Sequence, residues 1–220
     1  MLFQNLGLLR DDPLAFLRLF LVVAIAIAVA IAVHEFSHAL AATALGDDTA
    51  RRQGRLSRNP LANLDPMGTL FLFLVGFGWG KPVPVSEWRL RGGLRGMAKV
   101  ALAGPVSGLV AAGLAGLVVR GTGLGQGSML EELLVAVVVF NILLAMFNLI
   151  PLPPLDGFRV AVGFLPRSLS LSFQRLEYYG IVPLLLLLIV DNFLGLGILW
   201  GIIRPGMNFF GRLFLGGGLL

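Results

Sequence analysis

The pattern of hydrophobic and polar residues divides the chain into long apolar runs separated by short charged stretches. A helix needs about 20 mainly apolar residues to cross the hydrocarbon core of a bilayer. Four runs reach or approach this length, and we expect about four transmembrane helices. The runs cover residues 19–45, 100–119, 133–150, and a fourth stretch that begins near 176 or 181 and ends between 190 and 203. The pattern therefore predicts an all-α polytopic membrane protein.

A fifth apolar segment, residues 67–80, is shorter and is interrupted by four glycines. Because it is too short and too broken for a confident crossing, we expect a re-entrant hydrophobic hairpin. Pro82 and Pro84 follow it, and two prolines one residue apart favour a short extended (β) segment over residues 81–85. The sequence thus predicts one irregular, non-spanning region between the first two transmembrane helices.

The placement of basic residues supports the hairpin and predicts an orientation. If residues 67–80 do not cross the membrane, 12 of the 17 basic residues fall on one side. Basic loops are retained on the cytoplasmic side, so we expect the N-terminus outside, four crossings and the C-terminus outside. The 12 are Arg51, Arg52, Arg55, Arg58, Lys81, Arg89, Arg91, Arg95, Lys99, Arg159, Arg167 and Arg175.

Composition narrows the class of protein further. Of the 220 residues, 57% are hydrophobic and 13% are charged, whereas about a quarter are charged in a soluble domain. The net charge of +5 does not indicate nucleic-acid binding, because the cations sit in short clusters beside apolar runs. We find no internal repeat and no long linker, and expect a single domain over residues 1–220. The tail, residues 205–220, is expected to lie along the membrane surface or to fray.

The only two histidines of the chain lie four residues apart, as His34 and His38, with Glu35 between them. On a helix, both imidazoles share one face and can reach a single ion, while Glu35 lies near enough to act on a bound water. This is the arrangement of zinc hydrolases, with two ligands and a general base on one helical turn. Because ionisable groups are costly in a transmembrane helix, we interpret the pair as a metal site.

A catalytic zinc ion needs a third protein ligand, and the chain contains no cysteine to supply it. Asp156 is the favoured carboxylate, because prolines after the third apolar run force the helix to unwind just before it. Asp47 and Asp48, just past the first helix, are alternatives. Without the histidine motif, Asp156 would be interpreted as a helix cap at an ordinary proline-rich turn.

The histidine motif, residues 34–39, and the proline-rich segment 148–157 that contains Asp156 together resemble the site-2 protease family of intramembrane zinc metalloproteases. Two further segments are similar to short bacterial and archaeal members, and the resemblance runs from about residue 20 to residue 180. In one departure, Gly108 stands where the family often has asparagine. The segments are His34-Glu35-Phe36-Ser37-His38-Ala39, Asn148-Leu149-Ile150-Pro151-Leu152-Pro153-Pro154-Leu155-Asp156-Gly157, Gly78-Trp79-Gly80-Lys81-Pro82-Val83-Pro84-Val85 and Ala103-Gly104-Pro105.

The resemblance implies one Zn²⁺ per chain, held by His34, His38 and Asp156 with water in the fourth position. It implies Glu35 as the general base. It also implies that Asn148 helps to hold the substrate or its oxyanion, for which a buried amide is a suitable donor. The alternative for Asn148 is a hydrogen bond to the unwound backbone. The loops are too short for the PDZ or CBS domains that longer members carry.

The expected activity is hydrolysis of peptide bonds within or near transmembrane segments of membrane proteins, as in regulated intramembrane proteolysis. The expected setting is a prokaryotic plasma membrane, with the active site toward the cytoplasmic side. The extended segment can pair with an unwound substrate by strand addition, so Lys81, Val83 and Val85 are candidate substrate-binding residues. The alternative is a plain membrane-surface loop.

Two other classes of protein remain open at this point. A membrane metal transporter or metal-binding protein also places His and Asp within the bilayer, but it would not need Glu35 beside a ligand. Other membrane proteases with the same histidine motif generally take a glutamate from a helix as third ligand, and no such helix is evident in the sequence.

Overall fold

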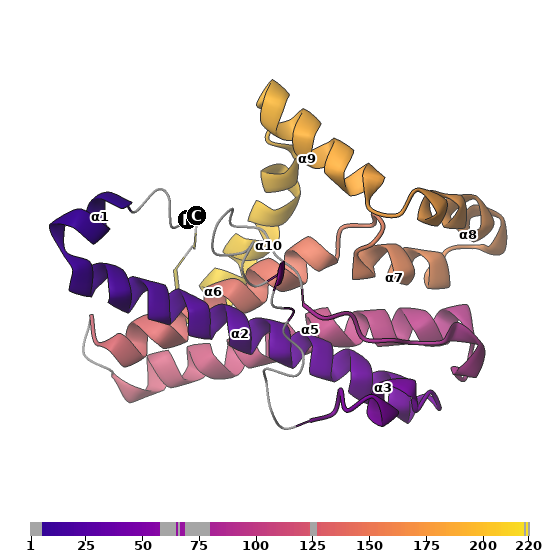
Figure 1. Ribbon diagram of the computed structural model, residues 1–220, viewed down its shortest axis with the longest axis horizontal. Coiled ribbons are helices and arrows are strands. Elements are labelled where there is room, and N and C mark those ends of the chain that lie inside the picture. The colour runs from indigo at the N-terminus through magenta and orange to yellow at the C-terminus, as the bar shows by residue number, and fades with distance from the viewer. Residues whose placement is uncertain are drawn as a thin grey trace.

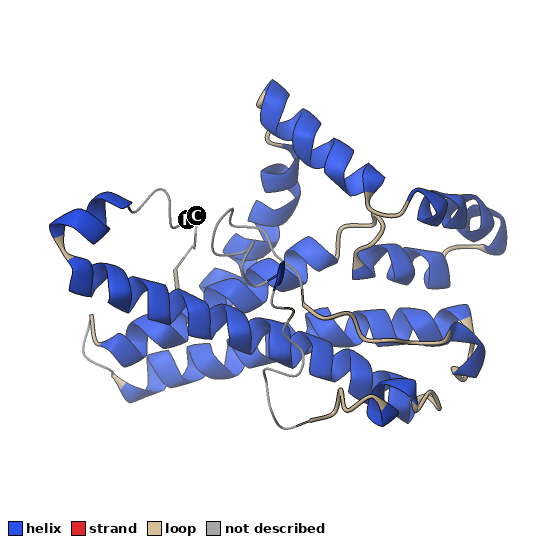
Figure 2. Ribbon diagram, in the orientation of Figure 1, coloured by secondary structure: helices blue, strands red, loops and turns tan. Residues whose placement is uncertain are grey.

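The computed structural model describes residues 6–57, 65, 67, 68, 80–123, 127–217 and 219. Within this part of the chain the secondary structure is helical, and no strand is assigned (Figure 2). This agrees with the all-α class predicted from the apolar runs. Most of the predicted re-entrant hairpin, residues 67–80, lies outside the described residues.

Three helices are long and apolar enough to cross a membrane, and they coincide with the first three predicted runs. They are α2 (Pro13–Ala44), α5 (Leu94–Thr122) and α6 (Met129–Asn148). Helix α2 begins six residues before the predicted run, because Asp12 caps it. The Asp12 carboxylate accepts the Ala15 N–H at 3.0 Å, and the ring of Pro13 suits the first helical turn.

The fourth predicted crossing is bent. Helix α8 (Arg167–Gln174) continues into a 3₁₀ turn, η4 (Arg175–Tyr179), and α9 (Val182–Leu194) follows at an angle of 77°. Gly180, with φ of 53°, lies at the break, in a conformation that favours glycine. The structure therefore has four candidate crossings when this bent pair is taken as one span, and three otherwise.

The tail does not fray in its described part, because residues 205–215 belong to helix α10 (Ile198–Leu215), which packs against α6 and α5. Gly116 allows the close approach: a Cβ atom there would lie 2.7 Å from the Phe214 carbonyl oxygen. At the corner between α9 and α10, the carboxylate of Asp191 accepts the N–H groups of Ile198 and Leu199 at 2.6 and 3.2 Å. Asp191 thus caps the first turn of α10.

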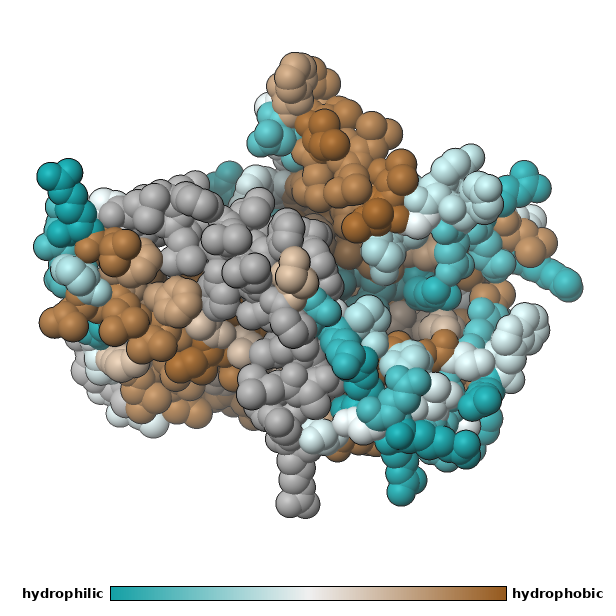
Figure 3. Space-filling model, viewed as in Figure 1, coloured by the Kyte–Doolittle hydropathy of each residue, from teal (hydrophilic) through white to brown (hydrophobic). Residues whose placement is uncertain are grey.

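Helix α5 is the centre of the arrangement and packs against α2, α6 and α7 (Asp156–Phe164). The short elements α1 (Leu6–Asp11), α3 (Thr49–Arg52) and η3 (Glu87–Arg89) lie at the ends of the bundle, and α9 stands away from it (Figure 1). Hydrophilic residues gather around α3, whereas α9 and the first half of α2 present mostly hydrophobic surface (Figure 3). Hydrophilic residues also lie over α1 at the opposite end (Figure 3), so the apolar surface lies between two polar ends, as a bilayer-embedded helix bundle requires.

No helix is assigned over the predicted extended segment, residues 81–85, and Gly80 before it takes part in an isolated β-bridge; the observed extended segment includes Ser86 and covers residues 81–86. Ser86 has φ of −103° and ψ of 110°, which is extended backbone. Two glycines, Gly92 and Gly93, both with positive φ, then turn the chain into α5.

Candidate metal centre and its cavity

His34 and His38 lie one turn apart on α2, and both side chains are buried. Their Nε2 atoms lie 3.0 and 3.2 Å from the same oxygen, Oδ2 of Asp156. The two rings are nearly perpendicular, with centroids 4.6 Å apart. The helical spacing has therefore brought both imidazoles to one point, as the sequence predicts.

Asp156 reaches this point because the chain unwinds between α6 and α7. Helix α6 ends at Asn148, and the proline-rich segment that follows makes short turns, such as the Leu155 N–H to Leu152 carbonyl bond of 2.9 Å. Asp156 is then the first residue of α7. Gly157 is required next to it, because a Cβ atom there would collide with the Leu149 carbonyl.

The donor set fits a zinc ion. Ligand atoms about 2.0–2.2 Å from a tetrahedral zinc stand roughly 3.3–3.5 Å from one another, close to the two nitrogen–oxygen distances given above. The His38 Nδ1 atom lies 2.8 Å from the Val100 carbonyl oxygen, which can only accept, so Nδ1 carries the proton and Nε2 presents a lone pair. This lone pair then faces the Asp156 Oδ2 atom at 3.2 Å, so two acceptors meet unless a proton or a cation lies between them. A cation between the two acceptors removes the conflict.

Two glycines allow neighbouring backbone to approach the site closely. A Cβ atom on Gly104 of α5 would lie 2.5 Å from His38 Nε2 and 2.7 Å from His34 Cε1. A Cβ atom on Gly80 would lie 2.8 Å from Ile31 Cγ2 and 3.1 Å from Glu35 Oε1. Gly104 therefore borders the histidines, and Gly80 borders the predicted base. In the sequence, both glycines stand out only as parts of the longer segments 78–85 and 103–105.

The site opens into a cavity of about 1350 Å³ between α2, α6, α9 and α10. His34, Glu35, His38 and Asp156 line it, with apolar side chains over most of the remaining wall. Of the four other predicted site residues, Asn148, Val83 and Val85 line the cavity, whereas the exposed Lys81 does not.

The Asn148 side chain donates a hydrogen bond to the Leu144 carbonyl of its own helix at 2.9 Å. This acceptor belongs to the last regular turn of α6 rather than to the unwound backbone that the alternative interpretation invoked. An amide nitrogen carries two hydrogens, so one is not used by this bond. Asn148 thus lies on the cavity wall with donor capacity to spare.

The alternative metal ligands do not join the site. Among the described residues, His34, His38 and Asp156 form the one group of His and acidic side chains close enough to share an ion. Asp47 is buried elsewhere and accepts hydrogen bonds from Thr49 and Ser86. Asp48 makes no side-chain cap at the start of α3. The structure therefore favours Asp156 as the third ligand.

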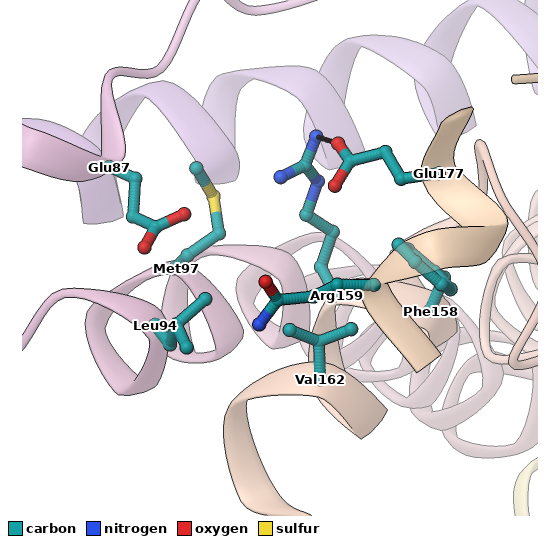
Figure 4. Close-up of a pocket in the computed structure, with 8 residues that line it drawn as sticks. Glu87, Leu94, Met97, Phe158, Arg159, Val162 and Glu177 are labelled. Carbon is teal, nitrogen blue, oxygen red and sulfur yellow. Dashed lines mark hydrogen bonds and ion pairs between the residues drawn. The ribbon is translucent and has the colours of Figure 1, made fainter. Parts of the chain in front are cut away.

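Arg159, one turn after Asp156, lines the large cavity and also a second, small one of about 40 Å³ (Figure 4). Its guanidinium forms an ion pair with Glu177 of η4 at 2.5 Å. Glu87 of η3 also lines the small cavity. The ion pair thus ties α7, which carries Asp156, to the bent segment before α9.

Comparison with known proteins gives three relatives of similar length. The chain is 35% identical to "Putative zinc metalloprotease YwhC" of Bacillus subtilis over 195 residues, covering 83% of this chain and 85% of that protein. It is 30% identical to "Putative zinc metalloprotease Rip2" of Mycobacterium tuberculosis over 194 residues, which is 84% of this chain and 73% of that protein. The Rip2 protein of Mycolicibacterium smegmatis is 26% identical over 184 residues, or 80% and 70% of the two chains.

No protein-family model and no solved structure matches the chain. The relatives nevertheless align over most of their own length. With the histidine and aspartate groups converging in a membrane-helix bundle, the chain belongs to the site-2 protease family of membrane zinc metalloproteases.

Proposed function

We propose that the protein is an intramembrane zinc metalloprotease that hydrolyses peptide bonds within or near transmembrane segments of other membrane proteins. One observation carries the proposal: His34, His38 and Asp156 converge beside Glu35 on the wall of a large apolar cavity between candidate membrane-spanning helices. An apolar cavity suits an apolar peptide, and the bordering carboxylate supplies the base that hydrolysis requires.

His34, His38 and Asp156 would hold the ion. A zinc ion bound there supplies Lewis-acid chemistry, which activates a water molecule and polarises the scissile carbonyl. Glu35 accepts the proton of the attacking water at a carboxylate oxygen and can return it to the departing amine. The Val100 carbonyl holds the ring of His38 in the orientation and tautomer that leave Nε2 available.

Asn148 and the extended segment would handle the substrate. The unused amide hydrogen of Asn148 can donate to the substrate carbonyl oxygen as negative charge develops on it. Val83 and Val85 lie on the same cavity wall, where an unwound substrate can pair with their backbone. Lys81 lies off this wall, so its role would be confined to the approach of the substrate.

We also propose the orientation and setting expected from the basic residues: a plasma-membrane protein of one domain, with the polar end that carries α3 in the cytoplasm. His34 is ten residues from the C-terminal end of α2, or about 15 Å at 1.5 Å per residue. The site would then lie inside the bilayer, nearer the cytoplasmic face, where water reaches it from that side.

The test compares the purified protein with its Glu35→Gln variant on a substrate that contains a transmembrane segment. We expect the variant to keep its zinc and to lose about 10²–10⁴-fold in cleavage rate, because only the proton transfer is removed. A His38→Ala variant should lose both zinc and cleavage, as should the native protein after treatment with a chelator. Metal content is measured by mass spectrometry and cleavage by the size of the products.

Full activity of Glu35→Gln would contradict the proposal. A membrane metal transporter, the alternative considered from the sequence, would instead move zinc across vesicles and leave the peptide intact. Its case is weakened because no second group of metal-binding side chains appears among the described residues, as a transport path would require.

A further inference from the structure

The turn that follows α2, residues 45–49, is hydrogen-bonded to the chain both before and after η3. We call this turn the corner. The C-terminal carbonyls of α2 are capped from there: Arg91 donates its backbone N–H to the Leu45 carbonyl at 2.8 Å and its side chain to the Ala44 carbonyl at 2.5 Å. The Arg89 side chain donates to the Thr49 hydroxyl at 3.2 Å. The end of the helix that bears the metal site is therefore bonded to the chain that follows the extended segment.

Asp47 is the buried centre of this corner and has no exposed surface. Its Oδ2 atom accepts the Ser86 N–H at 2.6 Å, and its Oδ1 atom accepts both the N–H and the hydroxyl of Thr49, at 3.0 and 2.5 Å. Burial alone raises the pKa of the Asp47 carboxyl, but these hydrogen bonds and the nearby Arg89 charge hold it below its ordinary value. The charged form is thus the one that binds Ser86.

Ser86 is the last residue of the extended segment, residues 81–86. Near the other end of this segment, the buried guanidinium of Arg55 donates to the Pro82 carbonyl at 3.3 Å. Between these two anchors lie Val83 and Val85, which line the cavity of the metal site. Among the described residues, no hydrogen bond reaches the backbone of either valine. The segment is therefore fixed at its ends while its middle is left to bond a partner.

The position of the segment along α2 matters for the chemistry. Gly80, directly before it, lies against Ile31 and Glu35, with no room for a Cβ atom. A shift of the segment by one residue would bring a side chain to this position and would exchange the sides to which Val83 and Val85 point. Whatever holds the segment in register therefore decides how well its free middle can bind a substrate that enters the cavity.

We infer that Asp47 is a positioning residue for the substrate, which holds the extended segment in register with the metal helix through its bond to Ser86. It touches neither the substrate nor the ion, and acts through the segment. The inference rests on the proposed protease function, because it takes the middle of the segment to be the edge that pairs with an unwound substrate.

The activity test uses Asp47→Ala and, as the matched control, Asp48→Ala in the full-length protein. Asp48 is the adjacent residue of the same charge and makes no side-chain cap bond. We expect Asp47→Ala to raise KM for a transmembrane substrate about tenfold or more, from the loss of a charge-assisted hydrogen bond, with kcat within about twofold and zinc content unchanged. Asp48→Ala should match the native protein in all three.

A second measurement needs no substrate. The chain has no cysteine, so Lys81→Cys accepts a single spin label on the segment, and Leu117→Cys accepts one on the exposed face of α5. Asp47→Ala should increase the mobility of the label at position 81 and leave the label at position 117 unchanged. A merely structural role in overall stability would loosen both positions.

An unchanged KM in Asp47→Ala, an unchanged label at position 81, a loosened label at both positions, or a loss of zinc would each overturn the inference. If the native protein cleaves no transmembrane substrate, the proposed function fails instead. The spin labels then still report whether Asp47 anchors the segment, so the two failures are distinguishable.

Discussion

Two glycines allow neighbouring backbone to approach the metal centre closely. Gly104 allows α5 to lie directly against both histidines, and Gly80 allows the chain before the extended segment to lie against Glu35. Gly104 borders the histidines that would hold the ion, whereas Gly80 borders the proposed general base. Substitution by alanine should therefore separate the two functions.

Alanine at Gly104 should impair metal binding. Its Cβ atom would lie 2.5 Å from a ligand nitrogen, so either the helix or the imidazole has to move. A displacement of this order at a reacting site costs about 10²-fold in rate, and we expect zinc to be lost at chelator concentrations that spare the native protein. Gly121→Ala, on the same helix with nothing within 4 Å, is the control. Equal zinc retention by both variants would argue against this role of Gly104.

Alanine at Gly80 should leave zinc in place and reduce kcat. The added Cβ atom would press on Ile31 and on the Glu35 carboxylate, and so displace the base rather than the ligands. We expect a fall in kcat of about tenfold or more, for displacement of a general base that contributes 10²–10⁴-fold. Zinc content and single-turnover cleavage together check this, and zinc loss from Gly80→Ala would be the contrary result.

At the scale of elements, Asp191 caps a helix at the turn between α9 and α10, within an otherwise hydrophobic region. Asp191 interrupts the fourth apolar run, whose end the sequence left open between residues 190 and 203. The structure places it at the end of α9, where its carboxylate binds the first N–H groups of α10. The chain turns between the two helices at Gly195 and Gly197, both with positive φ, and the Asp191 carboxylate binds the N–H groups that this turn exposes.

Removal of this cap should destabilise the protein modestly. Replacing a capping carboxylate by alanine costs about 0.5–2 kcal/mol, so we expect Asp191→Ala to lower the unfolding temperature in detergent. The adjacent Asn192 is exposed and makes no such bond, and Asn192→Ala should melt like the native protein. Identical melting of the two variants would mean that the cap contributes nothing.

At the scale of the whole molecule, the polar end around α3 and the apolar surface over α9 and the first half of α2 are consistent with the proposed orientation (Figure 3). Helix α5 runs between the two sides, with Lys99 exposed near its start and Thr122 exposed at its end. We expect a membrane-impermeant thiol reagent to label Thr122→Cys in intact cells. Lys99→Cys should react only after the membrane is permeabilised, and the reverse pattern would invert the topology.

Helix periodicity and composition were enough to predict the three long spans, the convergence of His34 and His38, and the unwinding before Asp156, because each follows from local spacing or from proline. The packing of α10, the double anchoring of residues 81–86 and the contacts of Gly104 could not be predicted. They depend on which surfaces meet across long separations in sequence, and a glycine shows no pattern that reveals its neighbour. Asp47 was singled out as a possible ligand, and only its surroundings show that it binds backbone instead.

The proposed metal ligands come from two separate elements, two from α2 and one from the first residue of α7. A bound ion therefore fastens helices that the chain itself joins only through a long path, and its binding energy adds to that of folding. Newly inserted protein in a zinc-starved cell would be held together less firmly and would be an easier target for degradation. The supply of zinc would thus set how much of the protein persists in the membrane, as well as how fast each copy works.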